Sequence, residues 1–179
     1  TSLTYPCSVM LVAAMNPCPC GYYGHPTRRC SCSQSTVSRY LSRISGPLLD
    51  RMDIHVEVPP VNFEHLSSEE NLETSSQIRE RVNKARLIQQ KRYSGKNISS
   101  NAKITPDSLQ KCCQMTEKAK QILHRAFETM GLSARGYDKI LKISRTIADL
   151  DDSDIIDVKH IAEAVQYRSL DRKYWNNAK

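Results

Sequence analysis

The stretch from Met10 to Cys32 (MLVAAMNPCPCGYYGHPTRRCSC) constrains the fold more than any other, because it holds four cysteines in two close pairs. Residues 21–29, which include glycine and proline, separate Cys18-Pro-Cys20 from Cys30-Ser-Cys32. Four thiolates that can meet in this way suit Zn²⁺, which binds four sulfurs tetrahedrally at about 2.3 Å and then stabilises the fold. We therefore predict a structural Zn²⁺ site whose ligands are Cys18, Cys20, Cys30 and Cys32.

Two other interpretations of these cysteines stay open. Because Cys-x-Cys is a tighter pair than the commoner Cys-x-x-Cys, one rival ligand set has His25 in place of a cysteine. The other interpretation is that the thiols are free within a loop. The remaining cysteines, Cys7, Cys112 and Cys113, lack a paired spacing of this kind and are expected to be ordinary buried or half-buried thiols.

Apolar residues directly before the cysteines predict a strand. The run Val9–Ala14 is apolar throughout, as in strands buried on both faces, and leads to the polar residue Asn16. A second strand is predicted at Ile54–Val58, and a helix over Ser33–Ser45 would connect the two as a parallel crossover. A buried strand needs neighbours that pair with its backbone groups, and none precedes it here, so we expect a fragment of a longer protein.

The charge balance favours anionic partners. The chain has 26 Lys and Arg against 19 Asp and Glu, a net charge of +7, which suits nucleotides or nucleic acids but equally serves solubility. No stretch approaches the ~18 apolar residues of a membrane helix, and the N-terminal residues lack the charged and apolar segments of a signal peptide. We therefore expect a cytoplasmic protein without a membrane partner.

The second half of the chain is predicted to be helical, because apolar residues recur at helical spacing over 67–93, 105–113, 116–130, 133–147 and 158–170. The first of these helices has a basic face that is either solvated or in contact with nucleic acid; it carries Arg79, Arg81, Lys84, Arg86, Lys91 and Arg92. Arg135 falls in the first turn of the fourth, where the helix dipole disfavours a cation. An anion is therefore expected beside Arg135, either a ligand or a carboxylate such as Asp138.

Several separate motifs together resemble one family. They are Asn16 after the apolar run, the Cys-Pro-Cys-Gly start of the insertion, Gly46-Pro-Leu-Leu-Asp-Arg51-Met-Asp53, and Ser133-Ala-Arg135-Gly. With these motifs the sequence resembles the magnesium-chelatase-like AAA+ ATPases of the ComM/YifB type over nearly its whole length. The resemblance implies a mainly α fold. Residues 1–62 would be the C-terminal part of an AAA+ α/β core with about two strands and a metal-binding insertion at 18–32, and 63–179 an all-helical lid domain.

The resemblance also implies three nucleotide-sensing roles. Asn16 matches sensor 1, an amide that orients the attacking water or touches the γ-phosphate. Arg51 matches the arginine finger, which reaches the nucleotide of a neighbouring subunit, and Arg135 matches sensor 2 on the lid. These roles agree with the chemistry of phosphoryl transfer, in which positioned guanidinium groups stabilise charge on the phosphate oxygens.

The sequence also departs from the family pattern. It contains no Gly-x-x-x-x-Gly-Lys-Ser/Thr motif and no apolar strand that ends in an acidic pair for Mg²⁺. We therefore expect no ATP hydrolysis by this chain alone, and ATP and Mg²⁺ to be cofactors of the parent protein. The resemblance implies that the parent is a hexameric homo-oligomer that remodels DNA, like a branch-migration helicase. The alternatives are a chelatase motor subunit and a zinc-stabilised nucleic-acid-binding module without an ATPase role.

Overall fold

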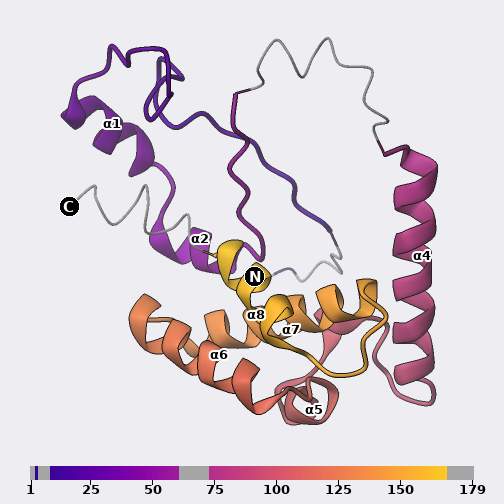
Figure 1. Ribbon diagram of the computed structural model, residues 1–179. Helices are drawn as coiled ribbons and strands as arrows, with labels where there is room; N and C mark the ends of the chain where they lie inside the picture. The colour runs from indigo at the N-terminus through magenta and orange to yellow at the C-terminus, as the bar shows by residue number, and fades with distance from the viewer. Residues whose placement is uncertain (1–2, 4–8, 61–72, 169–179) are drawn as a thin grey trace. The chain divides into compact units, whose positions relative to one another are not determined.

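The computed structural model describes residue 3 and the ranges 9–60 and 73–168, which are mostly helical, as predicted (Figure 1). These residues form two compact units that divide between Arg43 and Ile44. The first unit contains α1 (Gln34–Leu41). The second contains α2 (Gly46–Arg51), α4 (Ser75–Arg92), the 3₁₀ turn η1 (Asn101–Lys103), α5 (Pro106–Cys112), α6 (Glu117–Met130), α7 (Ala134–Leu150) and α8 (Val158–Gln166). The predicted domain border near residue 62 lies outside the described residues.

The longer helices begin and end where local chemistry favours it. Side-chain oxygens of Thr116 and Ser133 accept backbone N–H groups in the first turns of α6 and α7, which otherwise lack partners. Helix α6 ends at Gly131, whose φ of 54° lies in the left-handed region that glycine adopts without strain. The helices predicted over 33–45, 105–113, 116–130, 133–147 and 158–170 are confirmed within the described residues, apart from small shifts at their ends.

Helix α2 differs from the prediction. The sequence predicts that Gly46-Pro47 ends a helix, but α1 already ends at Leu41 and Pro47 lies in the first turn of α2. Proline suits that position because its missing N–H would have no partner in a first turn. Ser45 caps the helix, since its Oγ accepts the N–H of Leu48 at 3.3 Å. The motif that ends in Arg51 is therefore a short helix of its own.

Neither predicted strand is formed in the described residues. Val9–Ala14 has no regular secondary structure and is solvent-exposed, with Met10 89% exposed. Ile54–Val58 forms no strand either. An apolar strand is stable only when neighbouring strands pair with its backbone and cover its side chains. The described residues supply no such neighbours for either run. Their isolated β-bridge, between Met115 and Ile156, joins two segments of the helical unit instead.

Helix α7 lies at the centre of the second unit. It packs against α8, α4, α5 and η1, while α6 packs against α8. The buried apolar side chains between these helices form one core, made of Tyr93, Ile104, Leu109, Cys113, Ala119, Leu123, Ile140, Leu141, Ala148, Ile156, Ile161 and Ala164. Removing this much apolar surface from water is the main source of stability for the unit.

A buried ion pair joins α4 to α7. The Asp149 carboxylate has a fully buried side chain and accepts from both terminal nitrogens of Arg92, at 2.5 and 2.8 Å. It also accepts from Arg145 Nε at 3.1 Å and from Asn101 Nδ2 at 2.8 Å. A buried carboxylate is tolerated when it is paired and hydrogen-bonded in this way. The C-terminal end of α4 is thereby fixed to the bundle.

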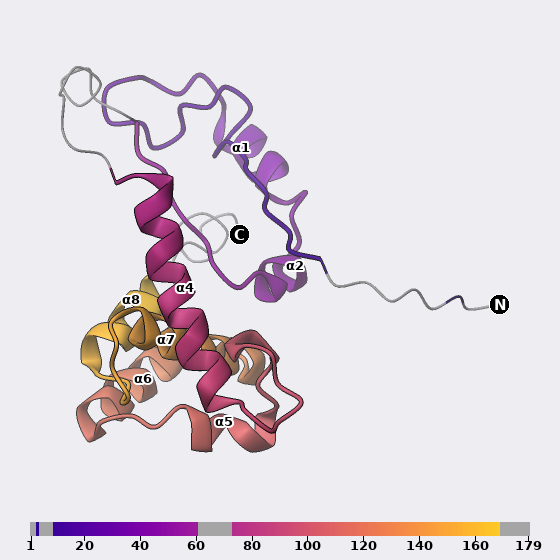
Figure 2. The same ribbon diagram turned by 90° about the vertical axis from the view of Figure 1, so that its right-hand side faces the viewer.

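The N-terminal half of α4 extends past the other helices of this unit (Figure 2). Residues 73–84 are all exposed, and the helix opens with a capping box in which Thr74 and Gln77 bond each other's backbone. The helix predicted over 67–93 is observed as α4 from Ser75 onward, and residues 67–72 lie outside the described residues. None of the described helices is long and apolar enough to cross a membrane.

Candidate functional site

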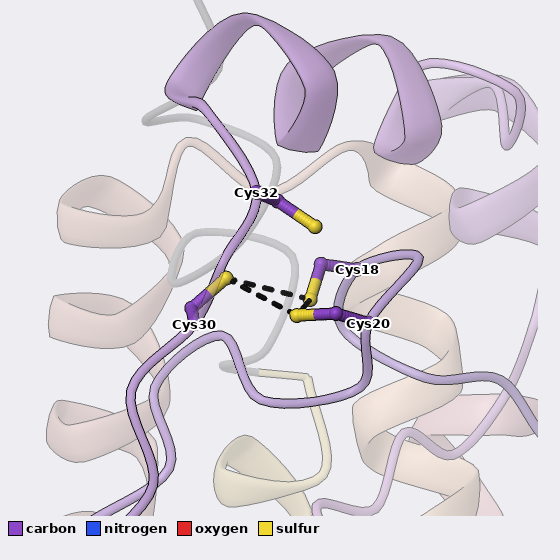
Figure 3. A group of neighbouring side chains, drawn as sticks. All are labelled: Cys18, Cys20, Cys30 and Cys32. Atoms are coloured by element: carbon purple, nitrogen blue, oxygen red, sulfur yellow. Dashed lines mark hydrogen bonds between the residues drawn. The ribbon is translucent and has the colours of Figure 1, made fainter.

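The four predicted cysteine ligands lie together in the first unit (Figure 3). The sulfur of Cys18 lies 3.4 Å from that of Cys20 and 3.7 Å from that of Cys30, and the last two are 3.5 Å apart. The sulfur of Cys32 lies within 4.8 Å of the other three. Four sulfurs around one Zn²⁺ at 2.3 Å would be about 3.8 Å apart, so this arrangement fits the ion.

A tight turn places the first cysteine pair. The N–H of Gly21 donates to the carbonyl of Cys18 at 3.0 Å, and Gly21 has a φ of 83°, which a residue with a side chain rarely adopts. After this turn, the N–H groups of Tyr22 and Ser31 donate to the sulfur of Cys20. These two bonds are the largest causes that lower the pKa of Cys20 to about 5, and hydrogen bonds with the Cys18 and Cys30 sulfurs add to the effect. The site thus favours a thiolate, the form of cysteine that binds metal.

The second cysteine pair is less favourable for free thiolates. A hydrogen bond from the N–H of Cys32 acts to lower the pKa of Cys30. Desolvation and the hydrogen bonds with Cys20 and Cys18 together outweigh it, and the pKa of Cys30 is raised to about 12. The pKa of Cys32 is raised in the same way. Crowded sulfurs therefore resist simultaneous ionisation, and a bound cation supplies the positive charge that four thiolates together require.

His25 has a different task from the cysteines. Its Nδ1 accepts the backbone N–H groups of Arg28 at 3.0 Å and Thr27 at 3.2 Å, which shapes the loop between the two pairs. The metal-type cluster found among the described residues consists of the four cysteines, and His25 is not part of it. Cys112 and Cys113 belong to the helical unit, where Cys113 is buried, as predicted for ordinary thiols.

The predicted sensor Asn16 lies in the first unit, just before the cysteine turn. Asn16 is exposed. Its side-chain atoms Cγ and Nδ2 lie 4.0 Å from the position that a Cβ atom on Gly21 would occupy, so the amide lies close to this glycine. The strand that was expected to deliver Asn16 is not formed in the described residues, so its role stays a prediction.

The predicted finger Arg51 is the last residue of α2, in the second unit. Its side chain is exposed, and its guanidinium donates to the carbonyl of Pro47 at 2.8 Å, one turn back in the same helix. An exposed guanidinium at the end of a short helix is sterically able to reach another molecule. This observation is compatible with the predicted role.

The predicted sensor Arg135 and the residue before Arg51 meet at the start of α7. The Asp50 carboxylate accepts the Ser133 hydroxyl at 3.1 Å and lies 3.7 Å from the Arg135 guanidinium. The positive end of a helix dipole also favours a carboxylate at this point. The expected anion beside Arg135 is therefore Asp50, which is 83 residues before Ser133 in the chain, rather than Asp138.

Sequence reasoning missed two basic residues that hold α2. The ammonium group of Lys139, in α7, donates to the carbonyl oxygens of Asp50, Arg51 and Met52. The guanidinium of Arg168, just beyond α8, donates to the Met52 carbonyl and to the Asp50 carboxylate. Neither residue belongs to a recognisable motif, and each contact joins positions more than 80 residues apart in the chain. Only covariation between distant positions of related sequences could have identified them.

The sequence matches two profiles of one family. The profile described as "Magnesium chelatase, subunit ChlI C-terminal" matches residues 72–168, and "Magnesium chelatase, subunit ChlI" matches residues 1–66. Among curated relatives, the chain is 42% identical over 171 residues to competence protein ComM of Haemophilus influenzae. It is 40% identical over 171 residues to the protein YifB of Escherichia coli, which is described as uncharacterized. Both alignments cover 95% of this chain but only 32% and 33% of the relatives, so the chain spans about a third of their length.

Proposed function

Since the chain belongs to the family of magnesium chelatase subunit ChlI, we propose that it is the C-terminal part of an AAA+ ATPase. Family membership confirms the resemblance predicted from the motifs. Under this proposal, residues before about 62 complete an α/β core that other segments of the parent protein build. The helical residues after it form the lid, and ATP binds between core and lid at a subunit interface.

The observation that best supports this proposal is the cluster at the start of α7. Arg135 and the Asp50-Arg51 end of α2 come from motifs far apart in the chain, yet the Asp50 carboxylate lies 3.7 Å from Arg135. The Arg135 side chain is 56% exposed, and exposed ion pairs are weak, so a phosphate can compete for this guanidinium. Arg51 is exposed as well. An exposed guanidinium group at each of these positions fits contact with the charged phosphates of a nucleotide.

Each residue has one role in the proposed mechanism. Arg135 binds phosphate oxygens of the nucleotide held by its own subunit, and Arg51 stabilises the charge that develops on the nucleotide of the next subunit. Asn16 orients the attacking water. The residues that cradle the phosphates and hold Mg²⁺ are absent from this sequence and would come from other segments of the parent. The parent is proposed to be a hexameric homo-oligomer that uses turnover to remodel DNA, as the resemblance to ATPases of the ComM/YifB type implies.

ATP hydrolysis tests this proposal directly. We expect the full-length protein to hydrolyse ATP in the presence of Mg²⁺, and this 179-residue chain alone to show none, because it lacks the phosphate-binding lysine motif. Phosphate release by both proteins, at equal concentration, is the measurement. A full-length protein without Mg²⁺-dependent turnover, measured with and without DNA, would contradict the assignment.

A second candidate function is favoured by the composition of the first unit. Residues 9–43 contain no aspartate or glutamate, and their basic side chains are Arg28, Arg29, Arg39 and Arg43, all exposed. Arg28 also lies over the ring of Tyr22, 5.3 Å from its centroid. Arginine and aromatic side chains without nearby carboxylates suit a single-stranded nucleic acid, whose phosphates and bases they contact. The cysteine unit would then be a zinc-stabilised nucleic-acid-binding module.

Neutralising exposed arginines tests the second candidate. Replacing Arg29, Arg39 and Arg43 with glutamine should weaken binding to a fluorescent single-stranded oligodeoxythymidine. It should also lower the slope of log affinity against log salt by about 2, because each lost phosphate contact removes about 0.7. Fluorescence anisotropy over a salt series measures both. The matched control replaces Arg79, Lys84 and Arg86 on α4, and an equal or larger loss in that variant would remove the first unit as the binding site.

A further inference from the structure

Lys139 makes polar contacts with several groups at the end of α2. Its Nζ lies 3.0 Å from the carbonyl oxygens of both Asp50 and Met52, and it also donates to the carbonyl of Arg51. The Asp53 carboxylate lies 3.1 Å away on the outer side, and the Lys139 side chain is only 14% exposed. An ammonium group has three N–H donors, so the three carbonyls together account for all of them.

These carbonyls are the ones that a short helix leaves without partners. The last C=O groups of any helix have no N–H of the next turn to bind, and a cation at that end also favours the helix dipole. In α2 a lysine from another helix supplies both the hydrogen bonds and the charge. Lys139 therefore fixes the end of α2, and with it the backbone of Arg51, relative to α7.

A second group, just beyond the end of α8, holds the same segment. Arg168 is 3% exposed, and its guanidinium donates to the Met52 carbonyl and lies 3.4 Å from the Asp50 carboxylate. The N–H of His55 donates to the carbonyl of Tyr167 at 2.9 Å. The backbone from Asp50 to His55 is thus attached to two helices of the lid, while the Arg51 guanidinium itself is exposed.

We propose that Lys139 is a positioning residue for Arg51. By binding the carbonyls of Asp50, Arg51 and Met52, it sets the direction in which α2 presents the Arg51 guanidinium, so that this arginine moves together with α7. The inference rests on the proposed function, in which Arg51 contacts the nucleotide of a neighbouring subunit. Its consequence is mechanical: a movement of the lid would be transmitted to the next subunit's nucleotide through Lys139.

Positioning and mere stabilisation predict different kinetics. A guanidinium displaced by about 1 Å loses up to about a hundredfold in the rate of the chemical step but little in ground-state binding. A lysine that only stabilises the fold would affect neither once the protein is folded. The kcat of ATP hydrolysis, compared with nucleotide affinity, separates the two roles.

The experiment uses the full-length protein with the series Lys139→Arg, Lys139→Gln and Lys139→Met. We expect the kcat of Lys139→Arg to stay near that of the unsubstituted protein. The kcat should fall in Lys139→Gln, and it should fall at least tenfold in Lys139→Met. The nucleotide Kd should change less than threefold throughout. Circular dichroism and thermal unfolding show which variants are folded at the assay temperature. If the methionine variant does not fold, the arginine and glutamine variants carry the comparison.

The matched control is Lys142→Met. Lys142 lies on the same helix, but its ammonium group donates to the Ala102 carbonyl at 3.3 Å instead of to the carbonyls of α2. Arg51→Ala serves as the reference. If Arg51→Ala leaves turnover unchanged, the proposed function fails. If Arg51→Ala stops turnover while the folded Lys139 variants match Lys142→Met, the arginine finger stands and the inference about Lys139 is overturned.

Discussion

Replacing Cys20 with serine is expected to abolish zinc binding and to unfold the first unit, while α4–α8 stay helical. The first unit has almost no apolar core, because its buried apolar residues among those described are Cys18, Val37 and Leu41. So few side chains cannot offset the entropy of ordering the chain. Binding of a structural zinc ion contributes about 10–16 kcal/mol to the folding of small zinc domains at neutral pH. The ion should therefore decide whether this unit is folded.

Zinc content and local structure measure this outcome. The unsubstituted chain should contain about one equivalent of zinc by elemental analysis, as a four-sulfur site predicts, and the Cys20→Ser chain none. Amide chemical shifts should lose their dispersion for residues of the first unit only. Cys112→Ser, a cysteine change in the helical unit, is the control and should keep the metal. An unsubstituted chain purified without zinc, which gains no structure when zinc is added, would rule out this metal centre.

Arg51→Ala in the full-length protein is expected to lower kcat for ATP hydrolysis by about 10³-fold or more. An arginine finger acts on charge that develops during phosphoryl transfer, so its removal affects turnover rather than ground-state binding. The exposed position of Arg51 at the end of α2 makes a large effect on folding unexpected. Nucleotide affinity should therefore change less than threefold.

Steady-state phosphate release and nucleotide binding by fluorescence measure the two quantities. Arg79→Ala, at an exposed position of α4, is the matched control for loss of a surface arginine. Because the finger is proposed to act on a neighbouring subunit, mixing Arg51→Ala subunits with subunits that cannot bind ATP should restore part of the activity. Turnover of Arg51→Ala equal to that of the control would remove Arg51 from the mechanism.

The helices could be predicted from sequence because their signals are local. Helix α6, for example, carries an apolar stripe between the cap Thr116 and the terminator Gly131, and both ends are observed. The two pairs of cysteines were predicted to meet for the same reason, since a short loop rich in turn residues joins them. Such signals lie between residues close together in the chain, so they can be recognised without knowledge of the tertiary structure.

The strands and the start of α2 could not be predicted in this way. The apolar run Val9–Ala14 reads as a strand only on the assumption that partner strands exist, and the described residues provide none. At Gly46-Pro47 the same dipeptide is compatible with the end of one helix and the first turn of another. Packing of Leu49, which is 8% exposed, favours the second.

The sequence by itself determined the family, the helical second half and the grouping of four cysteines, because these follow from motifs, periodicity and close spacing along the chain. Only the tertiary structure decided that Asp50 is the anion beside Arg135, and that Lys139 and Arg168 hold the backbone around Arg51. These contacts join residues more than 80 positions apart. No local preference encodes them, since they arise only when the core of the helical unit brings α7 and α8 against α2.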